Sequence, residues 1–196
     1  MTLSRNALRT LVRTKRRQLS LDQRQQDALE LAASFSQLPI VQQSQHIALY
    51  LSNDGELDTQ PLFERLWLQR KKTYLPVLHP FSKGQLLFLH YHRESVMTTN
   101  RYGIAEPKLD QRLILPASQL NLICVPLVAF DSDGNRLGMG GGYYDRTLEP
   151  WFNTGRGPEP IGIAYDCQFV DAIPAEAWDI PLPMIATPTK TWQWSG

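Results

Sequence analysis

The chain has 196 residues, of which 42% are hydrophobic and 20% are charged, and its formal net charge is +1 at pH 7. This length is enough for one domain with its own buried core. The near-zero net charge gives no global field that would attract nucleic acid or a membrane surface.

No apolar run approaches the length of a transmembrane helix, and the N-terminus lacks the apolar core and cleavage site of a secretory signal. The only two cysteines, Cys124 and Cys167, lie in apolar, strand-like runs. This placement is more typical of free thiols in a reducing compartment than of one disulfide. We therefore expect a cytoplasmic protein with a single domain over residues 1–196.

Residues 3–18 are predicted to form a helix, because their apolar residues recur at helical spacing. Arg5, Arg9 and Arg13 recur every four residues and therefore share one face. Three interpretations of this basic face are open: a solvated surface, guanidinium groups that reach a polyphosphate, or a patch that binds nucleic acid. The absence of interleaved aromatic residues speaks against the third.

A second helix is predicted from its cap, Ser20, to about Gln37, where Pro39 ends it. The next three elements are a strand at His46–Ser52, a helix at Gln60–Lys71 capped by Thr59, and a strand at Thr73–Leu78. Such a βαβ unit implies a parallel strand pair with a right-handed crossover.

Glu56 lies in the loop that follows the first strand of this unit. Ligands of open α/β sheets bind beyond the carboxyl ends of the strands, so Glu56 is a candidate ligand contact. The alternative is a surface acid that only favours the start of the next helix. Glu106, before Pro107, is likewise either a ligand-facing acid or part of a rigid turn.

The remaining predicted elements complete an α/β domain of three-layer type, Rossmann-like, with a mainly parallel central sheet flanked by helices. A break is expected in the fourth strand at Pro126, and the last helix is expected to stop at Pro150. These elements are strands at Gln85–Tyr91, Leu122–Phe130, Ile161–Tyr165 and Met184–Thr187, and a helix at about Tyr144–Trp151.

The segment between the fourth strand and that helix contains a glycine-rich loop. Four of the five residues from Gly138 to Gly142 are glycine, a third of the twelve in the chain. This concentration predicts a loop whose main-chain N–H groups face phosphate oxygens. It is no Walker A motif, because no Gly-Lys-Ser or Gly-Lys-Thr follows. Nor is it the dinucleotide fingerprint, because Tyr143 stands where the third glycine belongs. A tight structural turn is the alternative.

The residues beside the loop favour the phosphate interpretation. Arg136 precedes it and can pair with phosphate, and Asp145 follows it and can hold magnesium. Tyr143 and Tyr144 offer flat faces for a ring to stack on, or pack in the core. This set predicts a nucleoside triphosphate site.

The segment Arg136–Arg146 closely resembles the signature of the 5-formyltetrahydrofolate cyclo-ligase family, also called methenyltetrahydrofolate synthetases. The regions of Arg5–Arg9, Glu56–Thr59, Gly103–Pro107 and Asp179 resemble the family in the same order. The resemblance implies an ATP- and Mg²⁺-dependent ligase that converts 5-formyltetrahydrofolate to 5,10-methenyltetrahydrofolate and releases ADP and phosphate. In the implied reaction, ATP phosphorylates the formyl oxygen and the folate's own N10 then closes the ring.

The resemblance also implies roles for individual residues. The chain departs from the family pattern at Trp178 and Pro183, beside one implied metal ligand. The implied ATP contacts are Arg5, Arg9, Arg136, Leu137, Gly138, Met139, Gly140, Gly141, Gly142, Tyr143 and Tyr144. The implied folate contacts are Leu51, Glu56, Glu106, Met139, Gly140, Gly141, Gly142 and Tyr143. The implied magnesium ligands are Asp145 and Asp179, and the implied catalytic residues are Arg136, Tyr143 and Tyr144.

We expect small-molecule substrates, a monomer, and no membrane or nucleic-acid partner. Two other functions are open. One is another ATP- or phosphate-binding α/β enzyme that shares only the glycine loop. The other is a nucleic-acid-binding protein that uses the basic N-terminal helix.

Overall fold

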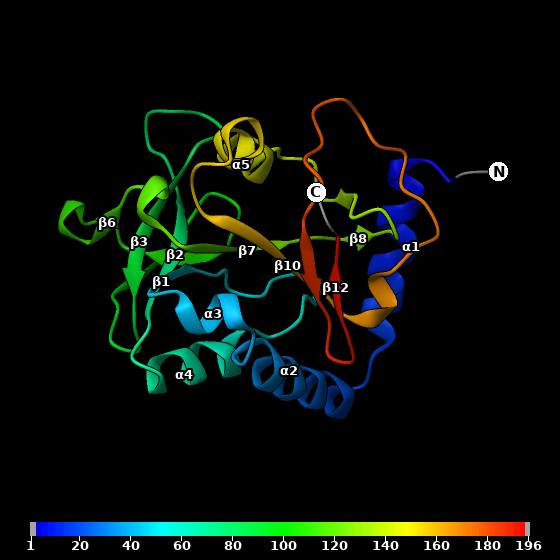
Figure 1. Cartoon of the computed structure of the whole chain (residues 1–196), viewed down its shortest axis with the longest axis horizontal. Helices are drawn as coiled ribbons and strands as arrows, with labels where there is room; N and C mark the ends of the chain where they lie inside the picture. Colours follow the sequence, from blue (N-terminus) through cyan, green and yellow to red (C-terminus); the bar gives the residue numbers. More distant parts are fainter. Residues whose placement is uncertain (1–2, 195–196) are drawn as a thin grey trace.

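An eight-stranded sheet forms the centre of the structure, a computed structural model that describes residues 3–194 (Figure 1). The strand order is β12-β11-β10-β7-β1-β2-β3-β6. The five strands from β11 to β2 pair in parallel, and β12, β3 and β6 pair antiparallel at the two sides. The predicted α/β fold with a mainly parallel sheet is thus confirmed. The strands are β1 (His46–Ala48), β2 (Lys72–Leu78), β3 (Leu86–Tyr91), β6 (Ile114–Leu115), β7 (Leu122–Pro126), β10 (Glu159–Ile163), β11 (Met184–Ala186) and β12 (Thr191–Gln193).

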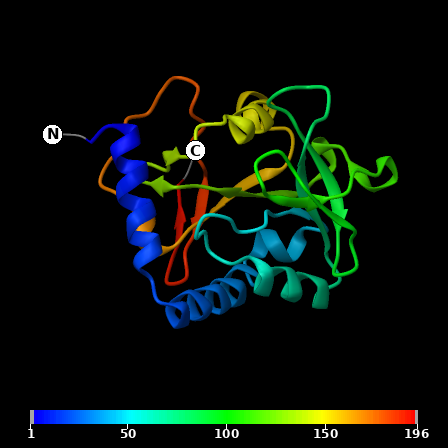
Figure 2. The same cartoon turned by 180° about the vertical axis from the view of Figure 1, so that it is seen from behind.

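Helices cover both faces of this sheet. Figures 1 and 2 show α2, α3 and α4 on one face, α5 on the other, and α1 at one end beside β8. Along β1, Ile47 packs in the cluster that contains α2 and α4, whereas Ala48 packs in the cluster that contains Leu148 of α5. Because both faces are covered, the parallel strands are mainly apolar, and their charged residues lie at the strand starts. The helices are α1 (Arg5–Gln18), α2 (Leu21–Phe35), α3 (Pro39–Gln43), α4 (Gln60–Leu68) and α5 (Tyr143–Thr154).

Two small hairpins lie outside the main sheet. One pairs β4 (Met97–Thr99) with β5 (Ala105–Pro107), and the other pairs β8 (Ala129–Phe130) with β9 (Arg136–Leu137). The second hairpin follows directly on β7. The break predicted at Pro126 is confirmed, since β7 ends there and the chain resumes pairing only at Ala129.

Prolines account for two errors in the predicted helices. The second helix ends at Phe35, and Pro39 begins α3 instead of only stopping α2, because proline is tolerated in a first helical turn. Pro150 does not end α5, which continues to Thr154. The residues after Pro150 remain helical because Trp151 packs on the core, and Gly155, in a left-handed conformation, closes the helix by donating to the Trp151 carbonyl at 2.7 Å.

The edges of the other elements also differ from the prediction. The strand β1 is only three residues long, and β12 has no counterpart among the predicted elements. Thr59 precedes α4 but does not cap it, because its hydroxyl donates to the Tyr50 carbonyl at 2.6 Å. Asp58 accepts from the Gln60 N–H at 2.9 Å instead. The loop between Tyr50 and Thr59 is therefore tied together at its base.

The order of the strands places this loop at a functional position. From β1 the chain moves to β2 on one side of the sheet, and it later builds β7, β10 and β11 on the other side. The loops that follow β1 and β7 therefore diverge, which is where α/β sheets bind ligands. Across residues 3–194, no helix combines the length and apolarity needed to cross a membrane.

Candidate active site

A cavity of about 820 Å³ opens where the loops after β1, β2 and β7 diverge. Its lining includes every residue predicted for the ATP, folate and magnesium contacts except Leu137. Residues 5–9, 51–56, 106 and 136–145, and Asp179, are thus brought together from distant parts of the chain. Leu137 is the exception because pairing of β9 with β8 turns its side chain into the cluster formed by Leu8 and Val12 of α1.

The glycine loop enters this cavity in a conformation that requires glycine. Gly140 has φ +95° and Gly142 has φ +65°, both in the region that L side chains rarely adopt. Gly142 is also the N-cap of α5, and no side chain caps this helix, unlike α1 and α2 with Ser4 and Ser20. The first N–H groups of α5 are therefore left for an anionic ligand.

Each carboxylate predicted to bind magnesium is paired with an arginine. Arg136 is buried, and its Nη2 donates to Oδ1 of Asp145 at 2.5 Å. The Arg5 guanidinium makes two hydrogen bonds to Asp179, one of them at 3.0 Å. Burial would raise the pKa of Asp179, but the hydrogen bond from Arg5 lowers it below its ordinary value. The Asp179 carboxylate is therefore charged at neutral pH, on the side of the cavity where the phosphates would lie.

This donor set fits magnesium bound to a nucleotide. Mg²⁺ usually takes one or two carboxylates and completes its shell with phosphates and water. Within residues 3–194, no group of three or more His, Cys, Asp or Glu side chains forms a metal site made by protein alone. Asp145 and Asp179 thus suit an ion that arrives with its phosphates.

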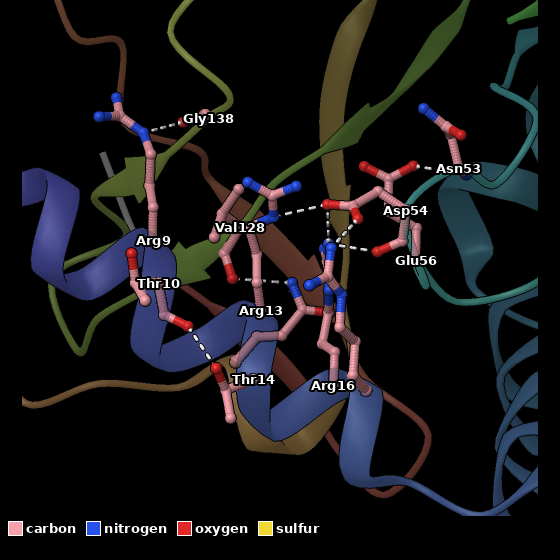
Figure 3. Close-up of polar contacts among 12 residues, drawn as sticks. Arg9, Thr10, Arg13, Thr14, Arg16, Asn53, Asp54, Glu56, Val128 and Gly138 are labelled. Atoms are coloured by element: carbon pink, nitrogen blue, oxygen red, sulfur yellow. Dashed lines mark hydrogen bonds and ion pairs between the residues drawn. The ribbon is translucent and has the colours of Figure 1, made fainter. Parts of the chain in front are cut away.

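Arg9 contacts the glycine loop directly. Its Nε donates to the Gly138 carbonyl at 2.9 Å (Figure 3). Its Nη1 donates to Asn6 at 2.7 Å. In the described part of the chain, Arg9 makes no ion pair with a carboxylate, unlike Arg5 and Arg136. Its positive charge is available to a ligand, as the polyphosphate interpretation of the basic face requires.

Glu56 lies at the opposite wall and is half-buried. Burial raises the pKa of Glu56 to about 7, although the N–H of Asn53, which donates to Oε2 at 3.1 Å, opposes this shift. Leu51, Leu75 and Ile104 provide apolar surface in the same cavity. Glu56 is therefore an acceptor group beside apolar surface, which suits recognition of a heterocycle with N–H donors.

Glu106 lies at the cavity and also takes part in bonds within the protein. It lines the cavity, and its Oε2 also accepts from Nδ2 of Asn100 at 3.0 Å and from the Leu78 N–H at 3.4 Å. These bonds fasten the β4–β5 hairpin to β2 beside the site.

The two tyrosines differ sharply. The Tyr143 hydroxyl contacts the Tyr102 hydroxyl and Nη2 of Arg101, both at 3.0 Å, and these bonds lower its pKa. Tyr144 also lines the cavity but packs against the core, and burial raises its pKa well above the ordinary value. Tyr143 is thus the tyrosine that can exchange hydrogen bonds with a ligand, whereas Tyr144 stays neutral and provides a wall.

Sequence reasoning missed several residues of the lining. Phe152 and Trp178 are 54% and 68% exposed at the cavity. No periodicity distinguishes such aromatic residues from surface ones in the sequence. Arg146 is the last residue of the signature segment but was assigned no role. Its Nη2 donates to the Gly141 carbonyl at 2.6 Å, and its Nε donates to the Gly84 carbonyl at 2.9 Å. The position of Arg146 beside the glycine loop in the sequence could have identified it as a residue of the cavity.

The rest of the basic face of α1 is engaged within the protein. Arg13 and Arg16 contact Asp54 (Figure 3), and so does Arg17. These charges already have a partner within the protein, which speaks against the nucleic-acid interpretation of the face.

Comparisons with known proteins agree with this geometry. The model of the 5-formyltetrahydrofolate cyclo-ligase family matches residues 1–188. The 5-formyltetrahydrofolate cyclo-ligase of Escherichia coli strain K12 is 52% identical over 186 residues, which cover 94% of this chain and 100% of that protein. The structure of Aquifex aeolicus 5,10-methenyltetrahydrofolate synthetase matches with a TM-score of 0.81 at 31% identity, covering 96% of this chain and 92% of that chain. A 5,10-methenyltetrahydrofolate synthetase from Mycoplasma pneumoniae matches with a TM-score of 0.73 at 26% identity, covering 95% and 99%.

Proposed function

The chain belongs to the 5-formyltetrahydrofolate cyclo-ligase family, and from this premise we propose that it uses ATP and Mg²⁺ to convert 5-formyltetrahydrofolate to 5,10-methenyltetrahydrofolate. The observation that carries the proposal is the cavity in which the glycine loop, two arginine–aspartate pairs and Glu56 meet. This arrangement provides anion-binding groups on one side and a recognition group for a heterocycle on the other.

In the proposed reaction, the formyl oxygen attacks the γ-phosphorus of ATP, and the bond to ADP breaks. N10 then attacks the formyl carbon, N10 loses its proton, and the bond from that carbon to the phosphorylated oxygen breaks to release phosphate. The formyl group needs this activation because an amide oxygen is a poor leaving group. No protein nucleophile is needed, so the enzyme has to align the two substrates and stabilise the transferring phosphoryl group.

The residues on the nucleotide side are suited to charge stabilisation. We assign Arg9 and Arg136 to the phosphates, together with N–H groups from Gly138 to Tyr143. Arg136 is held in place by Asp145, and Arg5 by Asp179. Mg²⁺ held by Asp145 and Asp179 would neutralise phosphate charge and fix the orientation of the nucleotide.

The residues on the folate side are suited to orientation. We assign Glu56 to the amino edge of the pterin, Leu51 and Met139 to apolar contacts, and Glu106 to the hairpin wall. Tyr143 lies between the two sides and can bond either ligand, and Tyr144 supports it from behind. We further propose that the protein acts as a cytoplasmic monomer on small-molecule substrates.

The test is an assay of the purified protein with 5-formyltetrahydrofolate, ATP and magnesium. The expected result is growth of the near-ultraviolet absorbance of the methenyl product, in proportion to enzyme and only when ATP is present. Folded protein that yields no product but transfers phosphate from ATP to another acceptor would support the alternative of a different ATP-dependent α/β enzyme. Retention on nucleic acid at physiological salt, lost on removal of charge at Arg5, Arg9 and Arg13, would support the nucleic-acid function.

A further inference from the structure

The turn that carries Glu56 is fastened to α1 through one residue, Asp54. Oδ2 of Asp54 accepts from Nε of Arg13 at 2.6 Å, and Oδ1 accepts from Nη2 of Arg17 at 2.7 Å. Nη2 of Arg16 donates to the main-chain carbonyl of Asp54 at 2.9 Å. Figure 3 shows the side chains of Arg13 and Arg16 directed at Asp54 from one helix.

Three arginines can reach a single carboxylate because they lie at i, i+3 and i+4 on one face of α1. Their exposure is graded: the side chain of Arg17 is 62% exposed, that of Arg13 36%, and that of Arg16 is fully buried. Burial would raise the pKa of Asp54, but the hydrogen bonds from Arg13 and Arg17 lower it below its ordinary value. The carboxylate is therefore charged and fully engaged at neutral pH.

Asp54 also holds an unusual backbone conformation, with φ +49°, and Gly55 follows at φ +74°. Aspartate and asparagine tolerate this left-handed region better than other L residues because their short side chains bond locally. The turn then closes on itself: the Glu56 N–H donates to the Asn53 carbonyl at 3.0 Å, and the Asn53 N–H donates to the Glu56 carboxylate at 3.1 Å. Asp54 therefore lies inside the turn in which the Asn53 N–H holds the Glu56 carboxylate.

We propose that Asp54 is a positioning residue for the folate: its carboxylate fastens the turn to α1 and so sets where Glu56 meets the substrate. The proposal deepens the function proposed above and rests on it. The same helix presents Arg9 to the glycine loop. One rigid element therefore serves as the reference for both substrates, and losing the Asp54 contact disturbs only the folate side.

The test is Asp54→Asn, because asparagine keeps the shape and the left-handed backbone but removes the charge. We expect the KM for 5-formyltetrahydrofolate to rise by about tenfold or more, since small displacements of substrate-positioning groups have effects of this size. The KM for ATP and kcat at saturating folate should stay within about twofold. Asp110→Asn is the matched control, since Asp110 also pairs with an arginine, Arg112, but lies outside the cavity lining.

The double variant Arg13→Gln, Arg17→Gln loosens the same carboxylate from its more exposed side and should shift the folate KM in the same direction. If Asp54→Asn does not fold, the folate KM of this double variant tests the proposal instead. Unchanged folate KM in both variants, or an equal loss in both KM values and kcat together with a lower Tm, would overturn the proposal.

Hydrogen exchange separates this inference from the proposed function. In Asp54→Asn, the Glu56 amide should exchange at least about tenfold faster, while amides of β7 keep their wild-type rates. Wild-type protein without turnover would refute the function while this experiment still tests the anchoring. Unchanged exchange at Glu56 would refute the anchoring even in an active enzyme.

Discussion

The buried position of Glu56 lowers the stability of the folded protein, and the proposed contact of Glu56 with the folate accounts for this position. Burial raises its pKa to about 7 from the ordinary 4.5, so the folded state is most favoured while Glu56 is protonated. That contribution to stability is present below about pH 4.5 and is lost as the pH rises through about 7. At pH 8 the charged carboxylate destabilises the fold but is the form that can accept hydrogen bonds from a pterin.

Glu56→Gln should therefore stabilise the folded protein but weaken its binding of the folate. We expect the free energy of unfolding to rise by about 2 kcal/mol at pH 8 and by much less at pH 5. The KM for the folate should rise by about tenfold, because a neutral amide replaces the carboxylate acceptor. Urea unfolding at the two pH values and steady-state kinetics measure these effects.

Glu64→Gln serves as the control for this prediction, because Glu64 lies exposed on α4 away from the cavity. Its free energy of unfolding should change by no more than about 0.5 kcal/mol at either pH. Equal stability of the Glu56 variant and the wild type at pH 8 would contradict the burial effect described for Glu56.

Asp145 has two roles at the residue scale, as a partner of buried Arg136 and as a proposed magnesium ligand. Asp145→Asn should reduce turnover by ~10²-fold at limiting magnesium, with partial recovery at high magnesium. Loss of the charged partner should also lower the free energy of unfolding by about 2 kcal/mol. The loss of turnover is measured by assaying activity over a range of magnesium concentrations, and the loss of stability by denaturant unfolding. If the variant depends on magnesium as the wild type does, Asp145 is not a magnesium ligand.

At the scale of elements, the two ends of α5 can be compared, because each has a glycine with the same backbone conformation. Gly142 at its N-terminus and Gly155 at its C-terminus both have φ +65°, but only Gly142 lines the cavity. A Cβ at Gly142 would lie 2.8 Å from Nη1 of Arg146, whereas nothing lies within 4 Å of one at Gly155. Backbone strain and damage to the site can therefore be separated within one helix.

Gly142→Ala and Gly155→Ala should each lower the free energy of unfolding by about 1 kcal/mol, from the strain of a left-handed alanine. Only Gly142→Ala should also lower kcat/KM, by ~10²-fold, since it displaces Arg146 and the N–H groups proposed to face phosphate. Thermal unfolding and kinetics of the pair provide the measurement. A similar loss of activity in Gly155→Ala would mean that α5 acts only through its stability.

The elements also show what sequence can and cannot reveal. The βαβ unit and the break at Pro126 were predictable, because hydrophobic periodicity and the missing proline N–H are local properties. The fates of Pro39 and Pro150 were not, because packing and the Gly155 cap determine whether a helix continues past a proline. In the site, glycine, arginine and aspartate residues were recognised from their spacing around one loop. Asp54 was not, because its three partners come from a helix about 40 residues earlier.

At the scale of the molecule, the cavity joins residues from both ends of the chain and both halves of the sheet. We expect one cooperative unfolding transition, as predicted for a single domain over residues 1–196, with far-ultraviolet circular dichroism and tryptophan fluorescence coinciding. ATP, magnesium and folate, each at 100 times its Kd, should each stabilise the native state by up to about 2.7 kcal/mol. A single domain would be contradicted if the two probes gave separate unfolding transitions. It would also be contradicted if a ligand shifted the transition seen by only one probe.

The contact between Arg5 and Asp179 spans 174 residues, and α1 packs on side chains from Val128 to Ile173. During synthesis, α1 is made long before any of these partners. Throughout most of synthesis, the nascent chain therefore exposes a basic helix whose apolar stripe has nothing to cover it. The cavity cannot be completed before Asp179 has been made, so a chain that stops before this residue lacks part of the proposed active site.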